Sequence, residues 1–183
     1  MSRISLGFRF VACAMVFSAV SALAQNRAPV PAGPKPAGAP VPPALLAAKT
    51  IFVSNAGADG GLFPHPFSGD PDRGYDEFFA DLQGLGQYQL VADPSQADLV
   101  LELRLTAPNG PTNPNKQYGA ADPLPEFRLV IYDRKSHYVL WALTEPIYVA
   151  VLQQTHDRNF DEALANLLAD FQGLTRGPAT AKP

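Results

Sequence analysis

The residues best suited to chemistry lie between positions 59 and 76, in a stretch rich in glycine and proline. Four aspartates and one histidine occur within these eighteen residues: Asp59, His65, Asp70, Asp72 and Asp76. Carboxylates and an imidazole could bind a hard or borderline cation, so a metal-dependent hydrolase is one function to weigh. The segment 70–76 lacks the ligand pattern of a calcium loop, however, and its aspartates fit a helix start equally well. We therefore expect neither a metal ion nor a cofactor.

The same stretch contains a histidine held between two prolines. His65 lies between Pro64 and Pro66 and is flanked by Phe63 and Phe67. Because proline restricts the backbone, the three rings are presented in a fixed arrangement. Long loops with several large apolar side chains are usually ordered and functional. We predict that Phe63, His65 and Phe67 form a recognition surface, and the alternative is that they pack over one end of the core.

Other catalytic arrangements find no support in the sequence. Cys13 is the single cysteine, and the chain has no G-x-S-x-G pattern for a nucleophilic serine. The glycines at 57–61 follow a predicted strand but match neither a phosphate-binding loop nor a dinucleotide fingerprint. With 14 Lys and Arg against 17 Asp and Glu, the chain also lacks the basic character of nucleic-acid binding. A non-enzymatic binding or assembly role, with a protein partner in the cell envelope, is the favoured reading over the hydrolase.

The first 24 residues have the features of a signal peptide. Arg3 and Arg9 precede an uncharged apolar run over 10–24, which is too short to span a bilayer and ends in a small-x-small pattern. Cleavage would then leave Gln25 as the first residue. Lipidation at Cys13 is a less favoured alternative, because Cys13 lies too early in the run to leave a hydrophobic core before it. We expect a protein exported to the periplasm or beyond, without a transmembrane segment in the mature chain.

The rest of the chain divides into three parts. Residues 25–43 contain seven prolines and predict a disordered linker rich in proline and alanine. Residues 44–175 are long enough for one domain with a real core. Residues 176–183 predict a disordered tail. The oligomeric state stays open at this point.

Periodicity within the domain predicts five strands and two amphipathic helices. The strands are expected at 50–53, 87–91, 98–106, 127–133 and 137–143. The first helix is expected after Asp70 and the second after an Asn159 cap. This order predicts an α+β two-layer sandwich: a mixed, mainly antiparallel sheet with both helices on one face. The predicted core comprises nine apolar residues: Phe78, Leu82, Leu101, Leu103, Leu129, Ile131, Leu164, Leu167 and Phe171.

The pattern from Phe78 to Trp141 resembles a small α/β module of bacterial envelope proteins. A helix ending in Leu82-Gln83-Gly84-Leu85-Gly86 leads into Tyr88-Gln89-Leu90-Val91, and Ala97-Asp98 opens the strand 99–103. The strand 129–133 and Val139-Leu140-Trp141 complete the likeness. The families it resembles are the amino-terminal domain of the periplasmic Tol-system protein, the curli-secretion lipoprotein and related domains of unknown function. The resemblance covers about half of the domain and implies scaffold, assembly or recognition roles, with no catalytic residues.

Overall fold

The computed structural model describes residues 39–112, 115 and 121–176. The predicted signal peptide, most of the predicted linker and residues 177–183 of the predicted tail lie outside the described residues. The elements in chain order are α1 (Pro43–Ala47), β1 (Thr50–Ala58), α2 (Arg73–Gly84), β2 (Gln89–Leu90), the 3-10 helix η1 (Pro94–Gln96), β3 (Leu99–Thr106), β4 (Asn109–Thr112), β5 (Ala121–Pro123), β6 (Glu126–Asp133), β7 (Val139–Pro146) and α3 (Gln153–Arg176).

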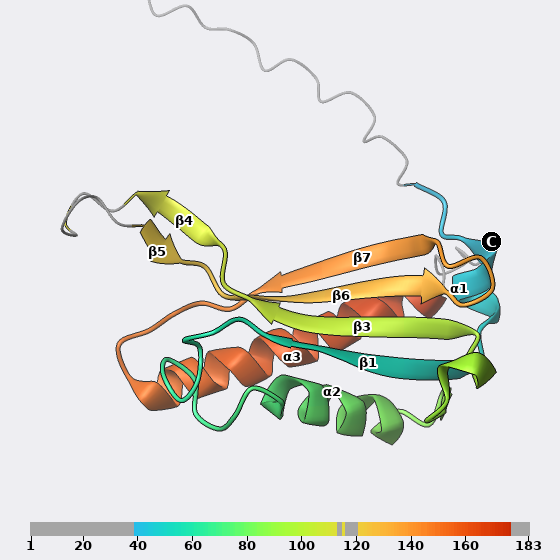
Figure 1. Ribbon diagram of the computed structural model, residues 1–183, viewed down its shortest axis with the longest axis horizontal. Coiled ribbons are helices and arrows are strands. Elements are labelled where there is room, and N and C mark those ends of the chain that lie inside the picture. The colour runs from blue at the N-terminus through green and yellow to red at the C-terminus, as the bar shows by residue number, and fades with distance from the viewer. Residues whose placement is uncertain (1–38, 113–114, 116–120, 177–183) are drawn as a thin grey trace, which may run out of the picture. The chain divides into compact units, whose positions relative to one another are not determined.

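The main sheet has five strands in the order β2-β1-β3-β6-β7 (Figure 1). The α+β class is confirmed, but the expectation of a mainly antiparallel sheet is wrong, because β1 pairs in parallel with both β2 and β3. Within this sheet, the β3–β6 and β6–β7 pairs are antiparallel. The helix α2 connects β1 to β2. Such a helical crossover allows β2 to run in the same direction as β1.

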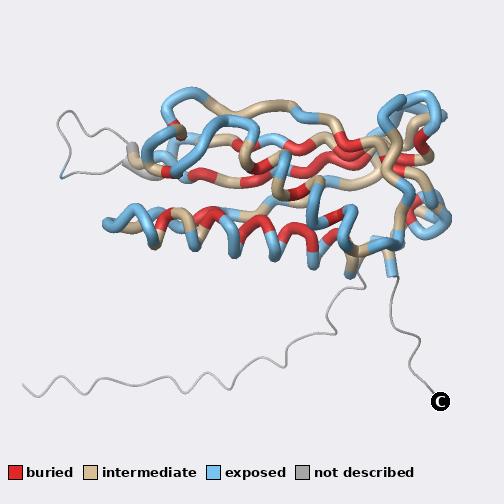
Figure 2. Tube along the Cα trace, turned by 90° about the horizontal axis from the view of Figure 1, so that it is seen from below, coloured by how far each residue is buried: buried red, intermediate tan, exposed pale blue. Residues whose placement is uncertain are grey.

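The core lies on one face of this sheet. Along β3 every second residue is buried. The register places Leu99 and Leu101 beside the buried Ile51 and Val53 of β1, and it places the last three of these leucines opposite buried residues of β6. The helices α2 and α3 contact each other and bury their apolar side chains in the same cluster. Figure 2 shows the buried residues of the sheet facing those of α3. All nine predicted core residues are buried, so the predicted strand phases and helix faces are confirmed.

Both helices begin at other residues than predicted. The residue before α2 is Asp72, and Asp70 instead accepts a hydrogen bond from the backbone N–H of Asp72 at 3.0 Å. The helix α3 begins at Gln153, six residues before the predicted cap Asn159. Asn159 is a helical residue whose Nδ2 donates to the carbonyl oxygen of Tyr148 at 2.6 Å. Its polar side chain therefore fixes the preceding turn and does not start the helix.

The excursion between β3 and β6 contains the short strands β4 and β5, which pair with each other and were not predicted. The helix α1 was also not predicted, and its Leu45 is buried in the core. Tyr118, which the sequence places in this excursion, lies outside the described residues. No helix within the described ranges has both the length and the apolar character needed to cross a membrane.

Candidate functional site

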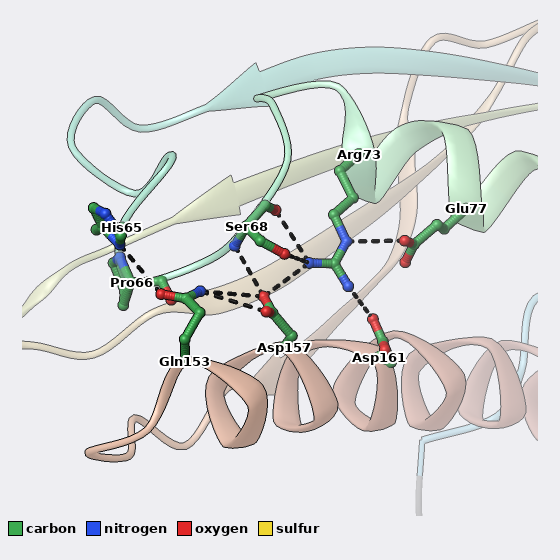
Figure 3. Close-up of polar contacts among 8 residues, drawn as sticks. All are labelled: His65, Pro66, Ser68, Arg73, Glu77, Gln153, Asp157 and Asp161. Atoms are coloured by element: carbon green, nitrogen blue, oxygen red, sulfur yellow. Dashed lines mark hydrogen bonds and ion pairs between the residues drawn. The ribbon is translucent and has the colours of Figure 1, made fainter.

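Arg73, at the start of α2, joins the glycine- and proline-rich loop to α3 (Figure 3). Its Nε lies 2.9 Å from Glu77 Oε1, and its Nη1 lies 3.1 Å from Asp157 Oδ1. Its Nη2 is paired with Asp161, and Nη1 also donates to the carbonyl oxygen of Ser68 at 3.1 Å. One cation therefore holds three carboxylates and the loop backbone in a single arrangement.

The electrostatics of this contact keep its groups charged. Burial alone would lower the pKa of Arg73, but the hydrogen bond and charge of Glu77, with the carboxylates of α3, raise it above its ordinary value. The backbone N–H of Ser68 donates to Asp157 at 2.9 Å and is the main cause that holds the pKa of Asp157 below its usual range. Asp157 therefore fixes the end of the loop onto α3 through a charge-assisted hydrogen bond.

Beneath the polar contact lies an aromatic cluster that includes two of the predicted recognition residues. The ring of Phe67 is 5.2 Å from Phe160 and 6.2 Å from Phe63 and from His156, measured between centroids. Phe67 is fully buried and Phe63 is partly buried against the core. The Arg73 guanidinium carbon lies 4.4 Å from the centroid of Phe160, within range of a cation–π contact.

Of the three predicted recognition residues, only His65 is exposed. Its Nδ1 lies 3.2 Å from Gln153 Oε1, and Gln153 Nε2 donates to the carbonyl oxygen of Pro66 at 2.7 Å (Figure 3). The structure therefore brings His65 to the start of α3, with Phe67 anchoring the loop from below. Recognition by these three residues stays a prediction, and in this arrangement Phe67 contributes to it only by holding the loop.

The five residues of the alternative metal site, which the sequence analysis did not favour, do not come together. Asp59 pairs with Arg104 at 3.0 Å and accepts from the backbone of Ala107, which is the main cause that lowers its pKa. Asp72 Oδ1 accepts from Asn55 at 2.7 Å. Asp70, as described above, binds backbone, and Asp76 lies in the first turn of α2. Within residues 39–112, 115 and 121–176, no three His, Cys, Asp or Glu side chains are placed to hold a metal ion.

Next to His65 lies an apolar segment that the sequence analysis did not single out. We call residues 147–152, between β7 and α3, the apical turn. Four of its side chains are largely exposed: Tyr148 (76%), Val149 (50%), Val151 (97%) and Leu152 (67%). Gln153, which contacts His65 and Pro66, follows directly. The two loops therefore form one surface at this end of the domain.

The apical turn is held by hydrogen bonds at both of its ends. The N–H of Ile147 donates to the carbonyl oxygen of Pro125 at 2.7 Å, and Ile147 itself is buried. The N–H of Ala150 donates to Nδ1 of the buried His156 at 3.3 Å. The carbonyl oxygen of Leu152 accepts from the first turn of α3. The backbone of the turn is thus fixed while its large side chains stay in solvent.

The face of the sheet opposite α2 and α3, which no helix within the described residues covers (Figure 1, Figure 2), is a second surface with hollows. One, of about 540 Å³, lies between η1 and the turn after β6, and a smaller one of about 260 Å³ adjoins it, with Glu102 and Tyr132 lining both. On this face Arg104 is directly opposite Arg128, and like charges in this position repel each other. Arg104 pairs with Asp59, so part of the charge on this face is neutralised. This face also carries fewer exposed apolar side chains than the apical turn.

The contact around Arg73 leads to a prediction on stability. Arg73→Met should lower the free energy of unfolding by about 1–2 kcal/mol. This cost is smaller than that of breaking a fully buried ion pair, because the carboxylates that pair with Arg73 are partly exposed and solvent screens their charges. The matched control is Arg158→Met, since Arg158 Nε is 3.6 Å from Glu162 in an exposed pair within α3. We expect its effect to stay within about 0.5 kcal/mol. Urea denaturation at pH 7 measures both.

Acid titration of the same variants provides a second test. The lowered pKa of Asp157 means that its carboxylate stabilises the fold above its unfolded-state pKa of about 3.9. That contribution is lost as the pH falls through the lower pKa of the folded state. Because Arg73 supplies part of this shift, the pKa of Asp157 should be lowered less in Arg73→Met. The variant should therefore lose less stability than the unmodified chain between about pH 5 and about pH 2. An equal loss would contradict this account.

Comparison with known proteins finds likeness in structure alone. No protein-family model matches the sequence, and no curated protein matches it significantly. Its structure neighbours include a DUF4136 family protein from Bacteroides thetaiotaomicron, at 14% identity, over 72% of this chain and 91% of that chain, with a TM-score of 0.45. A PelC dodecamer variant from Paraburkholderia phytofirmans follows at 14% identity, over 71% and 89%, with a TM-score of 0.40.

TolB from Acinetobacter baumannii is also a structure neighbour. It is 15% identical over 72% of this chain and 29% of that chain, with a TM-score of 0.37. The neighbours thus include the Tol-system protein that the sequence between Phe78 and Trp141 resembles, together with proteins of DUF families and lipoproteins.

Proposed function

We propose that this chain is an exported, non-enzymatic protein of the bacterial envelope with a binding or assembly role, and that the apical turn is its contact surface. The observation that carries the proposal is the exposure of Tyr148, Val149, Val151 and Leu152 on a turn whose backbone is fixed. Burying one such side chain in an interface is worth about 1.5–3 kcal/mol. Contiguous apolar groups of this kind mark interaction sites.

The loop residues predicted from the sequence support this surface in two ways. His65 is exposed beside the apical turn and can contact the same partner, while Phe63 and Phe67 hold its loop in place from the core. Arg73 donates to the loop backbone at Ser68 and pairs with two carboxylates of α3, which fixes the loop against α3. A partner would then meet a preformed surface, which lowers the entropic cost of binding.

Site-specific photocrosslinking in cells that express the full chain tests this proposal. Photoreactive benzoylphenylalanine is incorporated in place of Val151, and the control carries it in place of Tyr138, whose 74% exposure matches that of the apical tyrosine. Tyr138 lies in the turn before β7, at the opposite end of that strand (Figure 1). We expect one discrete adduct from position 151 that Leu152→Asp abolishes. Equal adducts from both positions, or none from position 151, would overturn the proposal.

A further inference from the structure

The charges around the apical turn indicate what kind of partner it takes. Resting on the proposed function, we infer that the apical turn binds a protein segment that combines apolar side chains with lysine or arginine. The apolar component follows from the turn itself, where four large side chains are exposed in five consecutive residues. The positive component follows from the side chains that surround it.

The surroundings of the turn are strongly acidic. Two segments at this end of the domain, 59–73 and 147–162, contain two arginines and no lysine. They carry six carboxylates: Asp59, Asp70, Asp72, Asp157, Asp161 and Glu162. Residues 39–176 hold all 17 acidic residues and 9 of the 14 basic ones, a net charge of −8, and these two segments carry −4 of it within 31 residues.

The two arginines are engaged with this acidic set. Arg73 lies among Asp157, Asp161 and Glu77, so a single positive charge is shared by three negative ones. Arg158 lies 3.6 Å from Glu162. Arg104 reaches from β3 to Asp59 and compensates that carboxylate alone. The excess at this end therefore stays negative and attracts a partner of opposite charge.

The same charges disfavour a membrane surface as the occupant. Apolar segments that lie on bilayers carry lysine and arginine beside their apolar residues, since the lipid surface is negative. Here no lysine or arginine occurs between Lys135 and Arg158, a stretch that includes the whole turn. The acidic set would be repelled by anionic lipids, whereas it complements a cationic protein segment.

Binding of defined peptides to the purified mature chain tests the inference. Three fluorescent probes are compared by anisotropy: a short amphipathic peptide of leucine and lysine, the same peptide with glutamate for lysine, and the same peptide with serine for leucine. We expect the leucine–lysine peptide to bind at least about tenfold more tightly than either of the others. Its affinity should fall with added salt, because exposed charges are screened over about 8–10 Å.

Variants locate the binding on the protein. Tyr148→Ser should weaken the leucine–lysine peptide about tenfold, while the matched control Tyr138→Ser leaves it unchanged. Asp161→Asn combined with Glu162→Gln should weaken it and reduce its salt dependence. Melting temperatures of all variants are measured alongside, and Arg73 retains two carboxylate partners in the double variant.

Each of the other possible results would contradict a different part of the inference. Equal binding of the lysine and glutamate peptides would remove the charge requirement while leaving the proposed function intact. Binding to phosphatidylglycerol vesicles that depends on Tyr148 would assign the surface to a membrane. Binding of no peptide, or an equal effect of both tyrosine variants, would remove the inferred partner, and the crosslinking at position 151 would still decide the proposed function by itself.

Discussion

Phe67→Ala should lower the free energy of unfolding by about 3–5 kcal/mol, the usual cost of removing a buried phenylalanine ring. Phe67 is fully buried, and its ring contacts those of Phe63, Phe160 and His156. Its loss would open a cavity between the loop and the start of α3. Chemical denaturation with two independent probes measures the change.

His65→Ala is the matched control for this prediction. His65 is two residues away on the same loop, but it is exposed and makes its 3.2 Å contact with Gln153 at the surface. We expect a cost below about 1 kcal/mol. The pair separates anchoring from recognition: crosslinking at position 151 should survive His65→Ala with altered yield and be lost with Phe67→Ala. Equal stability of the two variants would contradict the docking of the loop.

The elements that could be predicted from the sequence are those with a clear local period. The alternation of β3 and the spacing of Phe78 and Leu82 define buried faces without reference to partners. The pairing of strands is different, because it is a long-range property. Nothing local in Thr50–Ala58 indicates that this strand lies between two parallel neighbours. The start of α3 was misplaced because Asn159 and Glu162 reproduce a capping pattern inside the helix.

The candidate site was predictable only in part, for a similar reason. Packing of Phe67 over the core was one of two interpretations that its position after Pro66 left open, and burial could not be decided locally. Arg73 meets Asp157 and Asp161 across 84 and 88 residues of sequence, beyond any local pattern. The apical turn did leave a signal in the run Ile147-Tyr148-Val149-Ala150-Val151-Leu152, which is apolar yet follows Pro146 at the end of a strand.

Two substitutions within β3 test which face of the sheet carries the core. Leu103→Ala should lower the free energy of unfolding by about 2–5 kcal/mol, because Leu103 is 3% exposed and lies opposite the buried Leu129. Val100→Ala, three residues earlier, is the matched control on the uncovered face beside Tyr132, and we expect about 1 kcal/mol or less. Thermal and urea unfolding measure both variants.

The outcome of this comparison bears on the functional argument as well. Side chains alternate along a strand, so a one-residue shift in register would exchange the two faces. A cost below about 0.5 kcal/mol for Leu103→Ala would show such an exchange, since surface substitutions stay within that range. The shift would also move the buried partners of Phe127, which packs 4.9 Å from Phe160 beneath the loop. The comparison therefore also tests the aromatic packing beneath the loop that lies next to the apical turn.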